Sequence, residues 1–193
     1  VATETCEYPL RELRPAEGAV FSSQDADSEG GDGRFFVWPW DELVDIAGEA
    51  VATAFGATPD GNWDGTNVLW RPLPLEAVAA ETDLDPEELA SELETARAEL
   101  FEIREGRTHP ATDDKILAAW NGLAIAALAE AGRAFGEVEY VEAAVRAADF
   151  VLTHLRDDPG RLLRSWRNGR AGRPAFADDH AAIVRGMAQI AEE

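Results

Sequence analysis

The feature that most constrains the fold is a pair of apolar, alanine-rich segments, 113–135 and 140–155, separated by a very short connection. In the first segment, apolar residues recur at helical spacing along one stripe: Ile116, Trp120, Leu123 and Ala127, with Leu117, Ala124, Leu128 and Ala131 beside it. A stripe this wide predicts a helix that is mostly buried. In the second segment the residues expected to point inward are Val141, Val145, Ala148, Leu152 and Leu155. Because Gly136 ends the first helix and the connection is short, we expect an antiparallel αα-hairpin.

A weak internal repeat extends this prediction. Asp113-Asp114 stands at the expected start of one helix, and Asp178-Asp179 stands at the start of another. A glycine followed by an apolar residue, Gly122-Leu123 and Gly186-Met187, comes later in each. A repeat of this kind predicts that the two helices are parallel neighbours, with helix 140–155 returning outside them. Both acidic pairs are then expected at the same end of the assembly.

Shorter elements are expected elsewhere. The predicted helices cover residues 3–14, 42–47, 49–55, 75–81 and 86–104. The last of these is opened by Asp85 as N-cap and by Pro86 in the first turn. Residues 34–38 suit a short strand. Residues 161–176 predict a two-stranded flap with a turn at Asn168-Gly169.

The charge of the chain limits the classes of molecule that it is expected to bind. Asp and Glu number 38 against 17 Lys and Arg, which gives a net charge of −21, and Lys115 is the only lysine. Such a chain repels polyphosphate, so no nucleic-acid partner is expected. The composition is typical of salt-adapted proteins, and an acidic docking surface for a basic partner is the alternative. No apolar run approaches the ~18–20 residues of a membrane-spanning helix. With no signal segment at Val1, we expect a soluble, cytoplasmic protein without a membrane partner.

Cysteine and histidine offer little for metal or redox chemistry. Cys6 is the one cysteine, which excludes an internal disulfide and a cysteine-based metal cluster. Its place in an expected helix, with no histidine near it in sequence, favours a structural thiol over a nucleophile. His109 and His154 lack metal-ligand spacing, and His180 falls on an apolar stripe with Val184 as an expected core residue. No zinc site and no cofactor are expected.

Four motifs occur in order along the chain: Ser23-Gln-Asp-Ala-Asp-Ser-Glu-Gly30, Phe35-Phe-Val-Trp38, Gly61-Asn-Trp-Asp-Gly65 with Asn67-Val-Leu69, and Asp113-Asp-Lys-Ile-Leu-Ala-Ala-Trp-Asn-Gly-Leu123. With them, nearly the whole chain resembles the region after the thioredoxin-like domain in the thioredoxin-domain protein family that includes a mammalian spermatogenesis-associated member. The resemblance implies a helical toroid of the six-hairpin glycosidase type, similar in shape to N-acylglucosamine 2-epimerases. One departure stands at 178–181, where that family usually has Asp-Asp-Tyr-Ala and this chain has His180.

The expected fold class is therefore mainly α: a partial (α/α) toroid of helical hairpins with short β-hairpin and loop insertions. Residues 1–193 are expected to form a fragment of one such domain. Within it, 1–74 would hold a helix end and a loop-rich insertion, and 75–193 the helical hairpins with their flap. The resemblance also implies that the thioredoxin-like domain and the remainder of the toroid, absent from this sequence, are partners in the parent protein.

The four aspartates at the expected helix starts are the candidate catalytic residues: Asp113, Asp114, Asp178 and Asp179. Carboxylates on neighbouring helices packed ~8–10 Å apart can face each other across a cleft. Glycoside hydrolysis uses a protonated acid and an ionised carboxylate ~5–9.5 Å apart. However, aspartates are also common at helix N-termini, because they cap free N–H groups and meet the positive end of the helix dipole. Catalysis and capping both stay open.

Aromatic and amide side chains add candidate sugar-binding residues. Asn121 could bond a hydroxylated ligand, or it could satisfy backbone groups between tightly packed helices. Trp63, in the Gly-Asn-Trp-Asp-Gly turn, and Trp166, in the flap, could stack on a sugar or pack on the toroid. Trp120, in contrast, is expected in the core.

Charged loops complete the candidate site. Arg164 and Arg167, followed by Arg170 and Arg173, could pair with the aspartates or bind an anionic sugar. Asp25 and Asp27 imitate the start of a calcium loop, yet its twelfth position is Phe36 instead of glutamate. We therefore expect an acidic loop at the mouth of a cleft and no metal site.

Two classes of function remain open at this point. The first is a carbohydrate-active domain, either a glycoside hydrolase or a sugar isomerase or epimerase, with a sugar or sugar derivative as ligand. The second is a non-catalytic binding module that serves the attached thioredoxin-like domain. Fold analogy alone does not choose between them.

Overall fold

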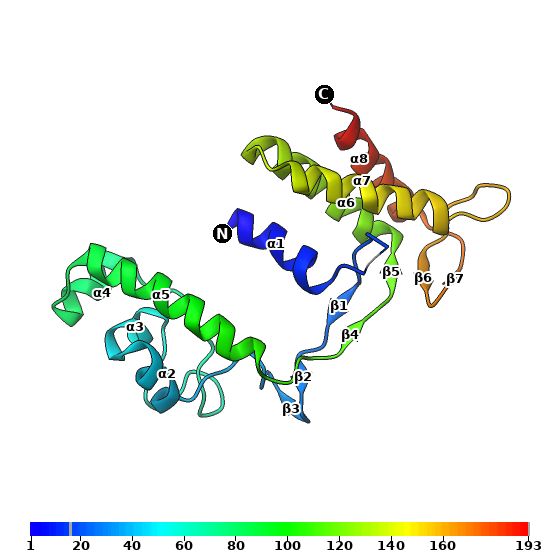
Figure 1. Ribbon diagram of the computed structural model, residues 1–193. Coiled ribbons are helices and arrows are strands. Elements are labelled where there is room, and N and C mark those ends of the chain that lie inside the picture. The colour runs from blue at the N-terminus through cyan, green and yellow to red at the C-terminus, as the bar shows by residue number, and fades with distance from the viewer. Residues whose placement is uncertain (16, 193) are drawn as a thin grey trace. The chain divides into compact units, whose positions relative to one another are not determined.

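A computed structural model describes residues 1–15 and 17–192 (Figure 1). Helices dominate this part of the chain, which confirms the mainly α prediction. The chain forms two compact units, one built from residues 1–25 and 112–193 and the other from residues 26–111. No helix among the described residues combines the length and the apolar character needed to cross a membrane.

The unit 26–111 contains four helices around one apolar core. They are α2 (Trp40–Ala47), α3 (Glu49–Ala54), α4 (Leu75–Thr82) and α5 (Pro86–Glu105). These bounds agree with the predicted helices to within about two residues. Asp85 caps α5 as expected, because its Oδ1 accepts hydrogen bonds from the backbone N–H groups of Glu87 (2.8 Å) and Glu88 (3.3 Å). The core of this unit includes Leu43, Val51, Val78 and Leu89.

The strand expected over residues 34–38 is absent, and Arg107 explains why. Its Nη1 donates hydrogen bonds to the backbone oxygens of Phe35 (3.1 Å) and Val37 (2.8 Å), and its guanidinium lies 3.8 Å from the ring centroid of Trp38. Because these two carbonyls accept hydrogen bonds from a side chain, they do not pair with the backbone of another strand. Only a single antiparallel bridge, between Trp38 and Asn67, remains of the expected strand.

The acidic segment before it forms a hairpin. Strand β2 (Asp27–Ser28) pairs with β3 (Gly31–Asp32) across a tight turn at Glu29 and Gly30, whose φ angles are 51° and 72°. Two positive φ angles in succession are typical of a type I′ hairpin turn. Asp27 therefore lies in a paired strand, which is not where an EF-hand calcium loop would place this residue.

Two asparagines hold the loop between α3 and α4. Asn67 is fully buried, and its Oδ1 accepts hydrogen bonds from the backbone N–H groups of Thr58 (2.9 Å) and Asn62 (3.2 Å). The Asn62 amide in turn donates to the carbonyls of Gly56 (2.8 Å) and Val68 (3.0 Å). The Gly-Asn-Trp-Asp-Gly motif thus builds a rigid loop from side-chain to backbone bonds.

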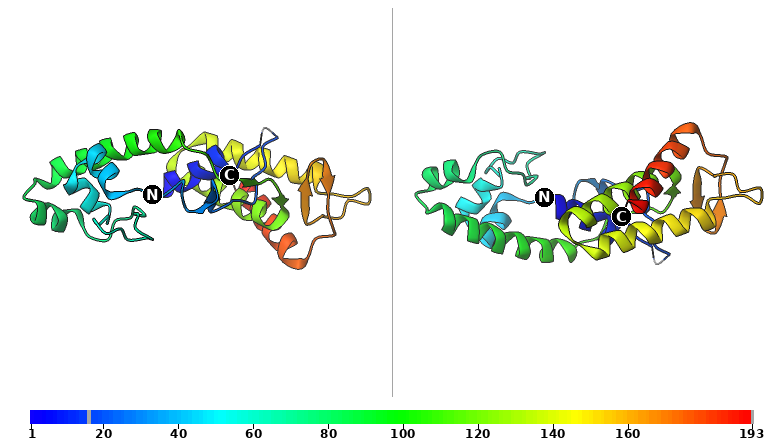
Figure 2. Two further views of the ribbon diagram at one scale, coloured as in Figure 1. Left: turned by 90° about the horizontal axis from the view of Figure 1, so that it is seen from below. Right: turned by 90° about the horizontal axis from the view of Figure 1, so that it is seen from above.

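The other unit is built on three long helices and one short one: α1 (Ala2–Glu12), α6 (Ala118–Phe135), α7 (Val138–His154) and α8 (Ala177–Ala191). Helices α6 and α7 form the predicted antiparallel hairpin. Helix α8 packs along α6, and the two run in the same direction, because Gly122 meets Ala182 at one end while Arg133 bonds Gln189 at the other. Figures 1 and 2 show these three helices side by side. The predicted parallel neighbours are thereby confirmed.

The first helix of that hairpin begins later than predicted, at Ala118 instead of Asp113. Residues 112–117 contain two short strands, β4 (Thr112–Asp113) and β5 (Ile116–Leu117), joined by residues 114–115. Strand β4 pairs with β1 (Ser23–Gln24), and β5 pairs with β6 (Ser165–Arg167). Because their backbone groups are used in these ladders, residues 112–117 cannot continue the helix toward its N-terminus.

The flap was predicted correctly and is larger than expected. Strand β6 pairs with β7 (Arg170–Ala171) across Asn168 and Gly169, whose φ angles are 50° and 76°. With β5 on its other side, the flap is a three-stranded sheet in the order β5-β6-β7. It is thereby tied to the start of α6.

The buried face of α6 differs from the expected one. Trp120 and Leu123 are half exposed (52% and 50%), whereas Ile125 and Ala129 are buried. The side of α6 that packs against α8 carries Gly122. Because this residue has no side chain, the two helices can approach each other closely. The same preference for small residues operates on α7, where Ala143, Ala144 and Ala147 are buried while Val145 and Leu152 are exposed. His180 is also exposed, so its prediction as a core residue is wrong.

Candidate functional site

The two aspartates at the start of α8 have different surroundings. Asp179 is buried, and its Oδ2 accepts a hydrogen bond from the backbone N–H of Phe176 (2.9 Å) and one from Arg164 (3.4 Å). The guanidinium of Arg164 also lies 4.8 Å from the centroid of the Phe176 ring. Asp179 is therefore a helix cap that ties the flap to α8. Asp178, by contrast, is exposed.

The other acidic pair lies at the end of β4 and directly after it, and both of its members are paired with basic side chains. Asp113 forms an ion pair with Lys115 at 3.0 Å, and Asp114 forms one with Arg167 of the flap. The hydrogen bond from Lys115 holds the pKa of Asp113 below its ordinary value. A carboxyl group with a lowered pKa remains ionised near neutral pH, so Asp113 is poorly suited to act as a general acid.

Of the two roles open to the flap arginines, the structure supports pairing with the aspartates. Arg164 binds Asp179 and Arg167 binds Asp114, so one short hairpin contacts both acidic segments. Of the four candidate catalytic aspartates, Asp178 alone makes no hydrogen bond or ion pair with the described residues.

Asp178 lies in a groove between the first turns of α6 and α8. The groove has a volume of about 470 Å³ and is lined by Ala119, Trp120, Leu123, Asp178, Ala181, Ala182 and Arg185. Arg185 forms no ion pair or hydrogen bond within the described chain either. Its Cα lies about 10 Å along α8 from that of Asp178. An exposed indole, one carboxylate and one guanidinium thus share one opening.

Asn121 has the structural role that was one of its two predicted alternatives. It is fully buried, and its side chain both accepts from the N–H of Val20 (2.8 Å) and donates to the carbonyl of Val20 (2.9 Å). A third bond goes to the carbonyl of Leu117 (3.0 Å). With the amide oxygen and nitrogen both engaged, Asn121 fixes the segment before β1 against α6.

The remaining candidates do not line the groove of Asp178. Trp166 is half buried and packs edge-on against Phe150, with a centroid distance of 5.2 Å, so it closes the core under the flap. Asp25 follows β1 in the unit that contains Asp178. Trp63 is half exposed beside a tight turn, but it belongs to the unit 26–111, as does Asp27.

Sequence reasoning missed Trp120 and Arg185 as groove residues. Trp120 was assigned to the core because it shares a helical stripe with Ile116 and Leu123. The available signal was glycine: Gly122 on α6 and Gly186 on α8 mark the faces of closest helix contact, so the bulky residues beside them must lie off that contact. Arg185 precedes Gly186 and is turned to the same side as Asp178.

Comparison with known proteins places the chain beside a small group of relatives. No established family profile matches it. The chain is 31% identical, over its whole length, to spermatogenesis-associated protein 20 of Homo sapiens and to the protein of the same name of Mus musculus. An uncharacterized protein of Caenorhabditis elegans is 26% identical over 94% of the chain.

These matches support the family link that the four motifs predict. The relatives are much longer than this chain, which spans 29% of the human and mouse proteins and 30% of the nematode protein. The similarity therefore concerns one region of those proteins, and their names describe no chemical activity.

Proposed function

We propose, from its relationship to spermatogenesis-associated protein 20, that this chain is a sugar-binding part of a glycosidase-like helical toroid that accompanies a thioredoxin-like domain. The observation that carries the proposal is the groove at the start of α6 and α8. It brings together the exposed ring of Trp120, the carboxylate of Asp178 and the guanidinium of Arg185, and the two charged groups have no partner among the described residues.

The chemistry of this groove fits a pyranose ring. One face of a pyranose presents C–H groups, which pack on the face of an indole, and its edge presents hydroxyl groups. Asp178 can accept hydrogen bonds from hydroxyls, and Arg185 can donate to them. Small-molecule sites typically have volumes of ~300–1,000 Å³ with a few polar groups on an apolar wall, which matches the groove.

The surroundings of the aspartates favour proton transfer by one carboxylate over hydrolysis by two. Glycoside hydrolysis needs a second carboxyl group, protonated and facing the first. Asp178 is the only acidic residue that lines the groove in the described chain, and Asp113, Asp114 and Asp179 are each bound to a cation. The reaction that this geometry supports best is therefore that of a sugar isomerase or epimerase, with Asp178 as the general base.

Saturation-transfer NMR with glucose, mannose, N-acetylglucosamine and glucuronic acid tests the proposal. We expect at least one sugar to bind, and its affinity to fall about tenfold in Trp120→Ala and in Asp178→Asn, because stacking and hydrogen bonding are both lost. Trp70→Ala is the matched control, since Trp70 is similarly exposed (58%) and lies in the other unit. Equal losses in the control, or no binding of any sugar, would remove the proposal.

A second function is favoured by the apolar character of the same surface. Trp120 and Leu123 of α6, and Phe176 at the cap of α8, are all at least half exposed. Exposed apolar side chains of this number suit protein contact, so the chain could present protein clients to a thioredoxin-like domain. A thiol-exchange assay on the full-length parent protein, with and without this region, separates the two functions. Unchanged client selection without the region would eliminate the binding-module proposal.

A further inference from the structure

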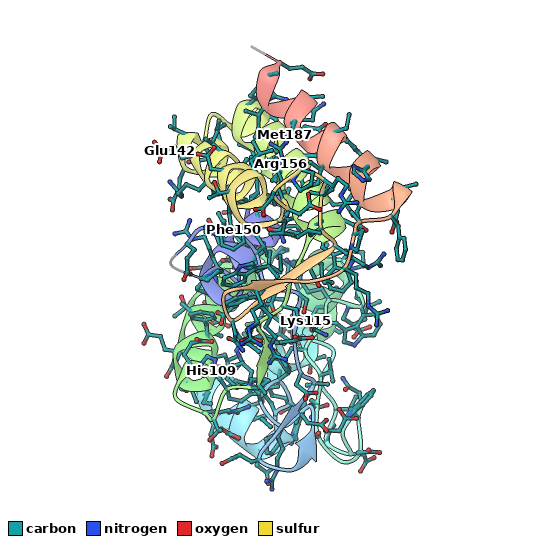
Figure 3. All side chains as sticks on the ribbon, turned by 90° about the vertical axis from the view of Figure 1, so that its right-hand side faces the viewer. His109, Lys115, Glu142, Phe150, Arg156 and Met187 are labelled. Atoms are coloured by element: carbon teal, nitrogen blue, oxygen red, sulfur yellow. The ribbon has the colours of Figure 1, made fainter. Side chains whose placement is uncertain are left out.

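A second groove lies on the opposite side of α8, where that helix meets the end of α7. It has a volume of about 350 Å³, and its floor is formed by apolar side chains that include Leu152, Leu162, Ile183 and Val184. Leu152 and Val184 are 46% and 67% exposed. Figure 3 labels Arg156, which follows α7 and lies at the rim of this groove.

The charged residues of this groove are all arginines. Arg156 and Arg161 line it beside His180, and no aspartate or glutamate does, although the chain carries 38 acidic residues. Arg161 is neutralised by Asp157, whose carboxylate lies 2.8 Å away. Arg156 forms no ion pair within the described residues, so it leaves a local positive charge in a strongly acidic protein.

The backbone holds Arg156 in place without using its outer nitrogens. Its Nε donates a hydrogen bond to the carbonyl of Gly160 at 3.1 Å. A Cβ at Gly160 would lie only 2.9 Å from Nη2, so the glycine makes room for the guanidinium. The two Nη groups have no hydrogen-bond acceptor among the described residues and can meet an anion in the bidentate geometry that guanidinium favours.

We propose that this groove binds a small amphipathic anion. A phosphate or carboxylate head group meets Arg156 and His180, and an apolar body lies on Leu152 and Val184. The site is separate from the groove of Asp178, because α8 directs residues 178, 181, 182 and 185 to that groove and residues 180, 183 and 184 to this one. The inference does not depend on sugar binding.

Both parts of the ligand are needed for measurable affinity. Exposed guanidinium groups bind free phosphate weakly, since water competes and salt screens the charge. Each methylene that leaves water contributes up to about a fourfold gain in affinity. A chain of several carbons on the apolar floor is therefore expected to improve binding well beyond that of the head group alone.

Isothermal titration calorimetry of the full chain with four probes tests this inference. The probes are n-hexyl phosphate, n-hexanoate, inorganic phosphate and 1-hexanol. We expect hexyl phosphate to bind at least tenfold more tightly than either inorganic phosphate or hexanol. The comparison of hexyl phosphate with hexanoate then identifies the preferred head group.

Variants locate the binding. Arg156→Gln and His180→Gln should each weaken hexyl phosphate binding about tenfold, and Val184→Asp should abolish it by placing a carboxylate on the floor. Arg170→Gln is the matched control, because Arg170 is an exposed arginine of the flap that does not line the groove. Circular dichroism checks that each variant folds, which is expected since all four positions are exposed. The proposal is overturned if hexyl phosphate binds no better than inorganic phosphate, or if Arg156→Gln and Arg170→Gln behave alike. Trp120→Ala should leave this binding unchanged, so failure here and failure of the sugar proposal are distinguishable.

Discussion

Gly122 of α6 and Gly186 of α8 face each other across the contact between two parallel helices. A Cβ on Gly186 would lie 2.8 Å from the carbonyl oxygen of Gly122, and one on Gly122 would lie 2.4 Å from the carbonyl carbon of Ala182. Both distances are shorter than side chains tolerate. The two helices approach so closely because neither position carries a side chain. Residues of both helices line the groove of Asp178, and residues on the other side of α8 line the second groove.

Replacing Gly122 with alanine should destabilise the chain, even though alanine favours helices more than glycine does. We expect a loss of about 2 kcal/mol in the free energy of unfolding, because the added methyl group forces α8 away from α6. Urea unfolding followed by circular dichroism measures it. Ala127→Leu, which adds volume on the exposed face of α6, should change stability by less than about 0.5 kcal/mol. A neutral Gly122→Ala would contradict the close contact.

Asp179 and Asp178 should respond very differently to removal of their carboxylates. Asp179→Ala removes the cap on the N–H of Phe176 and the partner of Arg164, so we expect a loss of about 1–3 kcal/mol. Asp178→Ala should cost about 0.5 kcal/mol, since only its interaction with the helix dipole is lost. Chemical unfolding of both variants measures the difference. Equal effects would show that the buried carboxylate is not the cap.

Lys115 should control the titration of Asp113. The hydrogen bond from Lys115 lowers the pKa of Asp113 from its ordinary 3.8, so the ionised carboxylate stabilises the fold above that pH. This contribution should disappear as the pH falls through the lowered pKa. In Lys115→Met we expect the pKa, measured by NMR of the carboxyl carbon, to move up toward 3.8. Added salt should have a similar, smaller effect on the unsubstituted protein, because the pair is partly exposed. An unchanged pKa in Lys115→Met would assign the shift to another group.

Asn67 should be more important for stability than any residue of similar size in its loop. Its buried side chain binds the backbone of Thr58 and Asn62, and Asn67→Ala leaves those groups without partners. We expect a loss of about 2–3 kcal/mol in unfolding free energy. Asn67→Asp should be nearly as damaging, because a carboxylate cannot donate to the carbonyl of Thr58. Thr66→Ala, which removes one exposed hydroxyl bond to Trp63, is the milder control.

Much of the helical framework was predictable because its signals are local. The cap at Asp85, the ends at Gly136 and the turn at Asn168-Gly169 each depend on the chemistry of a few neighbouring residues, and the structure confirms them. The repeat of Gly122 and Gly186 also identified the parallel pair. What local signals could not supply was the pairing of residues 112–117, since β1 and β6, their partners, are distant in sequence.

The site was less predictable than the fold for the same reason. The aspartates and the flap arginines that could pair with them were predicted from the sequence. Which arginine binds which aspartate was not predictable, because Arg164 and Arg167 reach Asp179 and Asp114 only through the folded flap. Trp120 was misplaced because α6 has two apolar faces and periodicity does not say which of them a neighbour covers. Only the positions of Gly122 and Gly186, considered on both helices together, indicate which face is covered.

The parallel packing of α6 on α8 has a kinetic consequence. Antiparallel α6 and α7 can meet through a two-residue turn, whereas α8 can reach α6 only after all of α7 and the flap have been traversed. Closing so long a segment costs chain entropy before the contact repays it. We therefore expect the α6–α7 hairpin to form early and the docking of α8 to be a late, slow step of folding. Both grooves would then appear only at the end of that process.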